Sequence, residues 1–196
     1  DTVLLTHEHI DHVYALPSLL HQLWLSGRDR ELKIVVPEGM EYIPEGMIEL
    51  FKFRSKKNIF KINVVSEKDF QVGSLSVQTF VTDHTLMSVG IVVTEGNNKL
   101  VYTCDTRPIN QPLSLMAGAK VLIHEASGLA EYEETLIKKG HSSAADAAEF
   151  AKKISPERLF LCHLPQGSNA KEAVLKEAKS FFEAAYIPEI LVEYTV

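Results

Sequence analysis

The chain has 196 residues, enough for one domain with a sizeable buried core. Its formal net charge of −6 argues against a broad basic face that coats nucleic acid, and no apolar run approaches the length of a membrane span. Two cysteines, Cys104 and Cys162, cannot form a disulfide framework, so we expect a reducing, cytoplasmic compartment. The chain opens on Asp1 directly before its first strand, so we expect further residues upstream in the natural protein.

Taken in chain order, the apolar patterns predict strands that alternate with helices. The predicted strands cover 2–6, 32–37, 60–65, 75–82, 120–126, 158–164 and 189–194, and the predicted helices cover 15–27, 46–53, 129–139, 143–154 and 169–185. Residues 88–105 predict a hairpin that turns at 95–98. This alternation is typical of a layered α/β domain, which we expect to span 1–196 with its functional site on loops at strand ends.

A dense group of imidazole and carboxylate side chains follows the first predicted strand, in the stretch "TVLLTHEHIDH". His7 and His9 lie two positions apart, so an extended backbone directs both rings to the same side. Asp11 and His12 come next, where the chain turns toward a helix. Side chains of this kind at this density indicate that something positively charged lies among them.

Further histidines and an aspartate stand at the ends of later predicted strands. His84 follows the strand at 75–82, and Asp105 and His163 end two others. Zinc favours imidazole nitrogen and carboxylate oxygen, and a set of this size is enough for two ions. A single strand-end histidine is usually a hydrogen-bonded residue, and we assign His21, inside a predicted helix, to that class.

The stretch "THEHIDH" resembles the signature of the metallo-β-lactamase superfamily, whose fold is a four-layered αββα sandwich with a dinuclear metal site. Further segments are similar to the ribonuclease Z group of phosphodiesterases, namely "HTLMSVG", "DTRP", "LIHEAS" and "GHSSAADAAEFAKK". The resemblance therefore implies that fold, with some N-terminal strands lacking in this chain. It also implies a metal-dependent hydrolase of phosphodiesters, small or RNA, and a homodimer as an assembly state to test.

The resemblance implies two divalent ions, zinc above all, with manganese or iron as alternatives. One ion would be held by His7, His9 and His84, and the other by Asp11, His12 and His163. Asp105 would bridge them. A hydroxide shared by the two ions would be the nucleophile, because bound metal lowers the pKa of water. Asp11 would also orient that hydroxide or take its proton.

Two more residues receive a catalytic role from the resemblance, Glu125 in "HEA" and His141 in "GHS". The glutamate would orient and charge the histidine, which would help the leaving oxygen depart as a general acid. A loop residue without a catalytic role is the alternative for His141. We expect a serine after His141 to cap the following helix, His124 to support its neighbours, and Glu8 to face away from the ligands.

The sequence also departs from this family. Cys104 stands where the family usually has glycine, and "LPQGS" follows His163. Asp105 follows His84 by only 21 positions, which leaves room for a hairpin but not for the long arm of enzymes that mature transfer RNA. Residues 51–61 mix phenylalanines with lysines and an arginine. That mixture either contacts a phosphate backbone or forms a solvated helix end with its phenylalanines in the core.

Two other function classes stay open. A lactone or thioester hydrolase of the same superfamily would share the ligand set, although the "HEA" and "GHSSA" segments speak against it. A non-catalytic binding member would keep the fold alone, but every metal-ligand position of the motif is filled here.

Overall fold

The computed structural model describes residues 1–108, 113–167 and 169–195. They form two compact units, Asp1–Val72 and Gly73–Val196. Each unit has its own sheet, its own helices and its own hydrophobic core. The α/β class is therefore confirmed, whereas one domain over 1–196 stays a prediction. No helix in the described part of the chain is long and apolar enough to cross a membrane.

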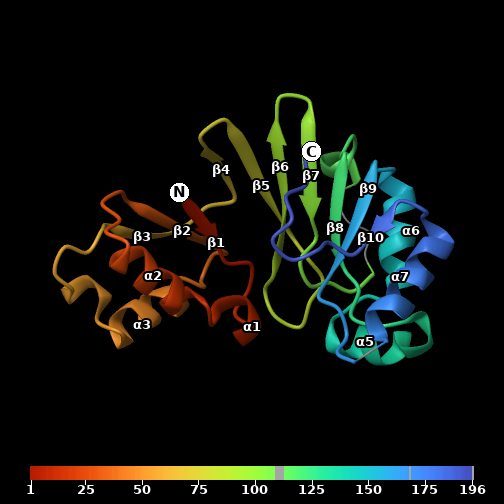
Figure 1. Ribbon diagram of the computed structural model, residues 1–196, viewed down its shortest axis with the longest axis horizontal. Coiled ribbons are helices and arrows are strands. Elements are labelled where there is room, and N and C mark those ends of the chain that lie inside the picture. Colours follow the sequence, from red (N-terminus) through yellow and green to blue (C-terminus); the bar gives the residue numbers. More distant parts are fainter. Residues whose placement is uncertain (109–112, 168, 196) are drawn as a thin grey trace. The chain divides into compact units, whose positions relative to one another are not determined.

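The first unit is built on a parallel sheet in the order β1-β2-β3 (Figure 1). The strands are β1 (Thr2–Leu4), β2 (Leu32–Val36) and β3 (Ile62–Ser66), and β4 (Asp69–Val72) ends the unit. Between the strands lie α1 (Ile10–Val13), α2 (Leu16–Leu25), α3 (Tyr42–Leu50) and the 3₁₀ turn η1 (Phe53–Ser55). The predicted strands at 2–6, 32–37 and 60–65 are thus confirmed to within two residues at their ends.

The core of the first unit joins the central strand to its helices. Leu20 of α2, Ile34 of β2 and Ile48 of α3 are at most 1% exposed and belong to one cluster. The basic stretch at 51–61 contributes Phe53 and Phe60 to the same cluster. These two phenylalanines therefore follow the packing alternative, since a buried ring cannot stack on a nucleic-acid base.

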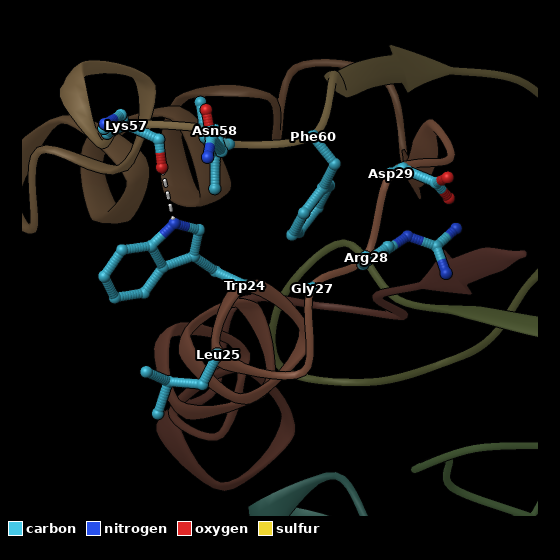
Figure 2. Close-up of a pocket in the computed structure, with 9 residues that line it drawn as sticks. Trp24, Leu25, Gly27, Arg28, Asp29, Lys57, Asn58 and Phe60 are labelled. Carbon is cyan, nitrogen blue, oxygen red and sulfur yellow. Dashed lines mark hydrogen bonds between the residues drawn. The ribbon is translucent and has the colours of Figure 1, made fainter.

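A pocket of about 670 Å³ lies in the first unit, where the end of α2 meets residues 57–60. Figure 2 shows the indole N–H of Trp24 donating to the carbonyl oxygen of Lys57, at 2.9 Å. The Arg28 guanidinium carbon lies 5.6 Å from the centre of the Phe60 ring. Among the described residues that line this pocket, none is a predicted site residue.

The sheet of the second unit runs in the order β10-β9-β8-β7-β6-β5. Its strands are β5 (Leu75–Val81), β6 (Val89–Glu95), β7 (Asn98–Tyr102), β8 (Val121–Glu125), β9 (Arg158–Cys162) and β10 (Ala185–Tyr186). Strands β5, β6 and β7 are antiparallel, and β7, β8, β9 and β10 are parallel. Glu95 pairs with Asn98 across a two-residue turn, which confirms the predicted hairpin.

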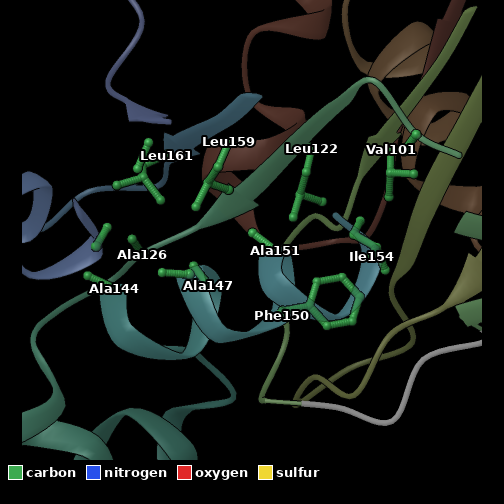
Figure 3. Packing of buried hydrophobic residues seen from close by; sticks show 14 of the residues in the cluster. Val101, Leu122, Ala126, Ala144, Ala147, Phe150, Ala151, Ile154, Leu159 and Leu161 are labelled. Carbon is green, nitrogen blue, oxygen red and sulfur yellow. The ribbon is translucent and has the colours of Figure 1, made fainter. Parts of the chain in front are cut away.

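The helices of the second unit are α4 (Leu113–Met116), α5 (Glu133–Lys139), α6 (Ala144–Ile154) and α7 (Ala170–Phe181), with the 3₁₀ turn η2 (Ala130–Tyr132) before α5. Helix α6 packs a row of alanines against the leucines of β8 and β9 (Figure 3). Small side chains allow the helix to approach the sheet closely. As expected, a serine caps α6: Asp146 N–H donates to Ser143 Oγ at 3.1 Å, and Ser143 N–H donates to the Asp146 carboxylate at 2.8 Å.

The predicted strand at 189–194 is wrong. Helix α7 ends at Phe181, and the last strand is β10, in which Ala185 is fully buried and pairs with Leu159. Leu191 is fully exposed and has a φ of 63°, which no strand residue adopts. The apolar alternation after Pro188 therefore does not produce pairing, because pairing depends on a neighbouring strand and not on the pattern alone.

Candidate metal site and its supporting network

The predicted site residues divide between the two units. The first unit holds His7, His9, Asp11 and His12, and the second holds His84, Asp105, Glu125, His141 and His163. Within each unit the structure brings several of these side chains into contact.

In the first unit, the loop after β1 turns the histidines inward. His7 is completely buried, and its Nε2 lies 3.0 Å from Nδ1 of His9. The hydroxyl of Thr6 lies 3.2 Å from the other nitrogen of His7. Two imidazole nitrogens at 3.0 Å share either a proton or a cation. The prediction that both rings point to the same side is confirmed.

Helix α1 begins directly after His9 and presents the next two predicted ligands. The ring centre of His12 lies 4.1 Å from that of His7, and His12 Nε2 lies 3.5 Å from Asp11 Oδ2. Glu8 accepts a hydrogen bond from the hydroxyl of Tyr42, which raises the pKa of Tyr42. Glu8 thus interacts with Tyr42 at the start of α3, as expected of an acidic residue outside the predicted ligand set.

In the second unit, Asp105 follows β7 and is 2% exposed. Its backbone oxygen accepts a hydrogen bond from Thr82 Oγ1 at 3.0 Å. The preceding residue, Cys104, is fully buried and has a φ of 56°. That conformation costs a residue with a side chain about 1–2 kcal/mol and is readily adopted by glycine. The left-handed turn gives a physical reason for the glycine that Cys104 replaces.

His163 follows β9 and also has a positive φ, 48°. Its Nε2 lies 3.4 Å from Asp105 Oδ2, and its Nδ1 lies 2.8 Å from Ser127 Oγ. The two nitrogens therefore face different partners. One meets a predicted bridging carboxylate, and the other meets a hydroxyl after β8.

Glu125 ends β8 and is completely buried. Its Oε1 accepts a hydrogen bond from the backbone N–H of Thr106 at 2.6 Å, and its Oε2 accepts one from Ser127 Oγ at 2.6 Å. His141 Nδ1 lies 3.1 Å from both carboxylate oxygens. The structure therefore brings together the two residues that the resemblance paired. Their catalytic roles stay a prediction.

His84 and His141 are held by the same short segment. The N–H of His84 at Nδ1 donates to the carbonyl oxygen of Gly140, at 2.8 Å, so Nε2 is the nitrogen that would ligate a metal. Gly140 has a φ of 86°, and an added Cβ would lie 2.7 Å from His84 Nδ1. Only glycine fits there. The ring centres of His84 and His141 are 5.2 Å apart, and those of His141 and His163 are 4.9 Å apart.

Two supports of this network were not predicted from the sequence, Ser127 and the backbone N–H of Thr106. Ser127 lies two positions after Glu125, so a locally extended chain places both side chains on the same side. That spacing was a usable signal. The sequence held no signal for the Thr106 N–H, because every residue type except proline has a backbone N–H.

The donors within each unit suit a divalent metal. Two ligands on a tetrahedral zinc with bonds of 2.0–2.1 Å lie about 3.3 Å apart. His163 Nε2 and Asp105 Oδ2 are 3.4 Å apart, and the nitrogens of His7 and His9 are 3.0 Å apart. In the second unit, Asp105, His141 and His163 offer ligand atoms that all lie within 4.8 Å of one another. The residues therefore fit the metal that the motif implies, and His141 itself is placed to be a ligand as well as an acid.

Two groups nearby, the buried His124 and the partly buried Cys162, stay uncharged near neutral pH. Burial lowers the pKa of His124, which packs 5.6 Å from the ring of Phe150 and hydrogen-bonds the Glu125 carbonyl oxygen at 2.7 Å. Burial, with a smaller contribution from Glu125, raises the pKa of the Cys162 thiol. His124 therefore supports β8 as a neutral ring, and the Cys162 side chain is a neutral thiol.

Comparison with known proteins defines the class. The sequence family described as "Beta-lactamase superfamily domain" matches residues 1–164. The chain belongs to this superfamily. The resemblance seen in the "THEHIDH" motif is thus confirmed by a match over most of the chain.

The relatives within this class include several ribonucleases Z. Ribonuclease Z of Picrophilus torridus is 27% identical over 241 residues, which cover 99% of this chain and 78% of that protein. Ribonuclease Z of Sulfolobus acidocaldarius is 26% identical over 95% of this chain and 78% of that protein. The first alignment spans 45 positions more than the 196 residues of this chain. The relatives therefore carry segments that this chain lacks.

Solved structures agree on the fold. A metallo-beta-lactamase fold protein, YhfI from Bacillus subtilis, has a TM-score of 0.75 at 22% identity, covering 94% of this chain and 73% of that one. Human tRNase Z, short form, has a TM-score of 0.71 at 24% identity, covering 84% of this chain and 72% of that one. The metallo-β-lactamase fold is confirmed. By family and by these relatives, the chain is a metal-dependent hydrolase.

Proposed function

We propose that the chain is a phosphodiesterase of the ribonuclease Z type that works with two divalent metal ions. The observation that carries this proposal is the contact between the fully buried Glu125 and the partly buried His141, 3.1 Å apart, in the same unit as Asp105 and His163. A thioester releases a thiolate, which needs less help from an acid than an alkoxide does. An alkoxide leaving from a phosphodiester needs a proton, and this pair can supply it.

The ligand assignment of the resemblance is part of the proposal. His7, His9 and His84 would hold one ion, Asp11, His12 and His163 would hold the other, and Asp105 would contribute to both. Family membership supports the set as a whole, and the contacts within each unit support its members locally. When bound, the ions supply Lewis acidity and lower the pKa of water.

The chain's own residues then have distinct tasks. Asp11, whose side chain is 57% exposed, accepts the proton of the attacking water. Glu125, fully buried and in contact with three donors, holds His141 by its Nδ1–H. The opposite nitrogen of His141 carries the proton to the leaving oxygen. Glu125 stabilises the protonated ring, so the acid is charged before the bond breaks.

The hairpin of β6 and β7 limits which substrates the enzyme can select. Of the twenty residues between His84 and Asp105, residues 89–102 form β6, β7 and their turn. No segment remains there for a long RNA-binding arm, so binding energy far from the reacting bond is missing. We therefore propose small aryl or nucleotide diesters as good substrates and precursor transfer RNA as a poor, unselective one.

The test compares three substrate classes on protein loaded with zinc or manganese. We expect hydrolysis of an aryl phosphodiester to exceed that of a lactone and of a thioester, with Asp105→Ala protein as the blank for contaminating hydrolases. A faster lactone or thioester reaction would favour the other hydrolase class, and metal binding without any hydrolysis would favour a binding member. Accurate 3′-end cleavage of a precursor transfer RNA, faster than the small diester, would contradict the substrate range. The homodimer and the cytoplasmic location stay predictions of this proposal.

A further inference from the structure

Ser127 stands between the buried glutamate and a predicted metal ligand. Its Oγ is 2.6 Å from Glu125 Oε2, 2.8 Å from His163 Nδ1 and 3.3 Å from the His163 carbonyl oxygen. A hydroxyl has one proton to donate, and a carboxylate can only accept. The bond to the carboxylate is the shortest of the three and is charge-assisted, so it takes the serine proton. His163 must then donate from Nδ1 to Ser127 Oγ.

We propose that Ser127 is a positioning residue that relays the charge of Glu125 to His163 and fixes the tautomer of that ring. With its proton on Nδ1, His163 keeps a lone pair on Nε2, the nitrogen that lies 3.4 Å from Asp105 Oδ2. Glu125 therefore serves two histidines, His141 directly and His163 through one hydroxyl. The consequence for metal affinity rests on the proposed ligation by His163.

The hydrogen bonds that hold Glu125 allow one isosteric substitution, Glu125→Gln, to reverse the direction of the Ser127 hydrogen bonds. The backbone N–H of Thr106 can only donate, so in Glu125→Gln the amide oxygen must occupy the Oε1 position, 2.6 Å from that N–H. The amide NH2 then faces Ser127 Oγ and donates to it. The serine proton turns to His163 Nδ1 and the ring proton moves to Nε2, where it blocks a metal.

The first measurement is zinc affinity by competition with a coloured chelator. We expect Glu125→Gln to weaken binding by about 10–100-fold, the usual effect of losing a partner of a metal-ligating histidine. Ser127→Thr keeps the hydroxyl and should bind as the wild type does. Ser127→Ala should lose less than Glu125→Gln, because the His163 ring then meets no hydroxyl at Nδ1 and its tautomer is no longer fixed from that side.

The double variant separates the relay from a general defect of the fold. In the Ser127→Ala background, Glu125→Gln should cause little further loss of zinc affinity, because there is no serine hydroxyl whose hydrogen bond could change direction. An equal loss in both backgrounds, or wild-type affinity of Glu125→Gln alone, would overturn the proposal. Circular dichroism of each variant checks that the comparison is made on folded protein.

A second measurement reads the tautomer without metal or substrate. Long-range ¹H–¹⁵N spectra of the imidazole rings in the metal-free protein, recorded at a pH above 8, should place the His163 proton on Nδ1 in the wild type and on Nε2 in Glu125→Gln. The opposite pattern in the wild type would overturn the relay. A wild type that shows the expected tautomer but binds no zinc would instead reject the proposed function and leave the relay standing.

Discussion

In the first unit, four candidate ligands lie within six consecutive residues, His7 to His12. In the second unit, by contrast, the candidate side chains come from separate segments between His84 and His163. The first group owes its geometry to one loop and one short helix. The second depends on the correct pairing of β7, β8 and β9, because Glu125 ends β8 and Asp105 and His163 follow β7 and β9. Contiguous ligands can thus be recognised by spacing, and dispersed ones require the sheet.

The two groups also differ in what holds them. In the first unit, the imidazoles contact one another and a neighbouring hydroxyl. In the second, a fully buried carboxylate anchors the site by accepting from Thr106, Ser127 and His141. A buried charge that loses a partner is costly, because it cannot be solvated instead. We therefore expect the largest effects of substitution in the second unit.

The sharpest test of this comparison is Asp105→Ala. Asp105 is 2% exposed and lies 3.4 Å from His163, in the position inferred to be shared by both ions. An alanine offers no charge to offset two cations, so elemental analysis should find at most one metal per chain. Activity should fall by more than about 10²-fold, the upper cost of losing a mere neighbour of a ligand. Glu157→Ala, an exposed carboxylate of the same unit, is the control, and two retained metals with normal activity would refute the assignment.

The next effect concerns the acid held by the buried carboxylate. His141→Ala should slow the cleavage of diesters with poor leaving groups by roughly 10²–10⁴, the range for a lost general acid. Diesters with a nitrophenolate leaving group need little protonation and should be slowed far less, with metal content unchanged. Because His141 is also placed to be a ligand, equal losses on both substrates together with a lost metal would assign it to the metal instead.

The same comparison explains which site residues could be predicted from the sequence. The cluster from His7 to His12 could be predicted because residues two positions apart on an extended chain point to the same side. Asp105 and His163 could be predicted only as strand ends, and Glu125 was paired with His141 through the family resemblance. The sequence could not predict the Thr106 N–H, which orients Glu125, nor the end of α7 at Phe181, since both depend on where other segments lie.

A third test compares the two cores. Leu122 is fully buried on β8, the strand that ends in Glu125, and it packs against the alanines of α6 (Figure 3). Leu122→Ala should lower the free energy of unfolding by about 2–5 kcal/mol, through lost burial and an unfilled cavity. Denaturant unfolding followed by circular dichroism measures it. Leu20→Ala is the matched deletion in the first unit, where Trp24, the only tryptophan of the chain, reports unfolding by fluorescence. A change below about 1 kcal/mol for Leu122→Ala would mean that β8 is not held by this core.

The smallest expected effect is the pH dependence contributed by His124. Burial holds the pKa of His124 below its ordinary value of 6.5, against weaker raising effects of Glu125 and Asp146. Above pH 6.5 the ring is neutral in both the folded and the unfolded chain, so its contribution to stability is complete. As the pH falls below 6.5, the unfolded chain takes up a proton first, and the folded state loses stability until its own lower pKa is reached. His124→Asn removes the titration, so the free energy of unfolding should fall less steeply between pH 6.5 and 5 than in the wild type. His21→Asn, an exposed histidine of α2, is the control. A slope that is unchanged by His124→Asn, or one changed equally by His21→Asn, would show that the acid sensitivity arises elsewhere in the chain.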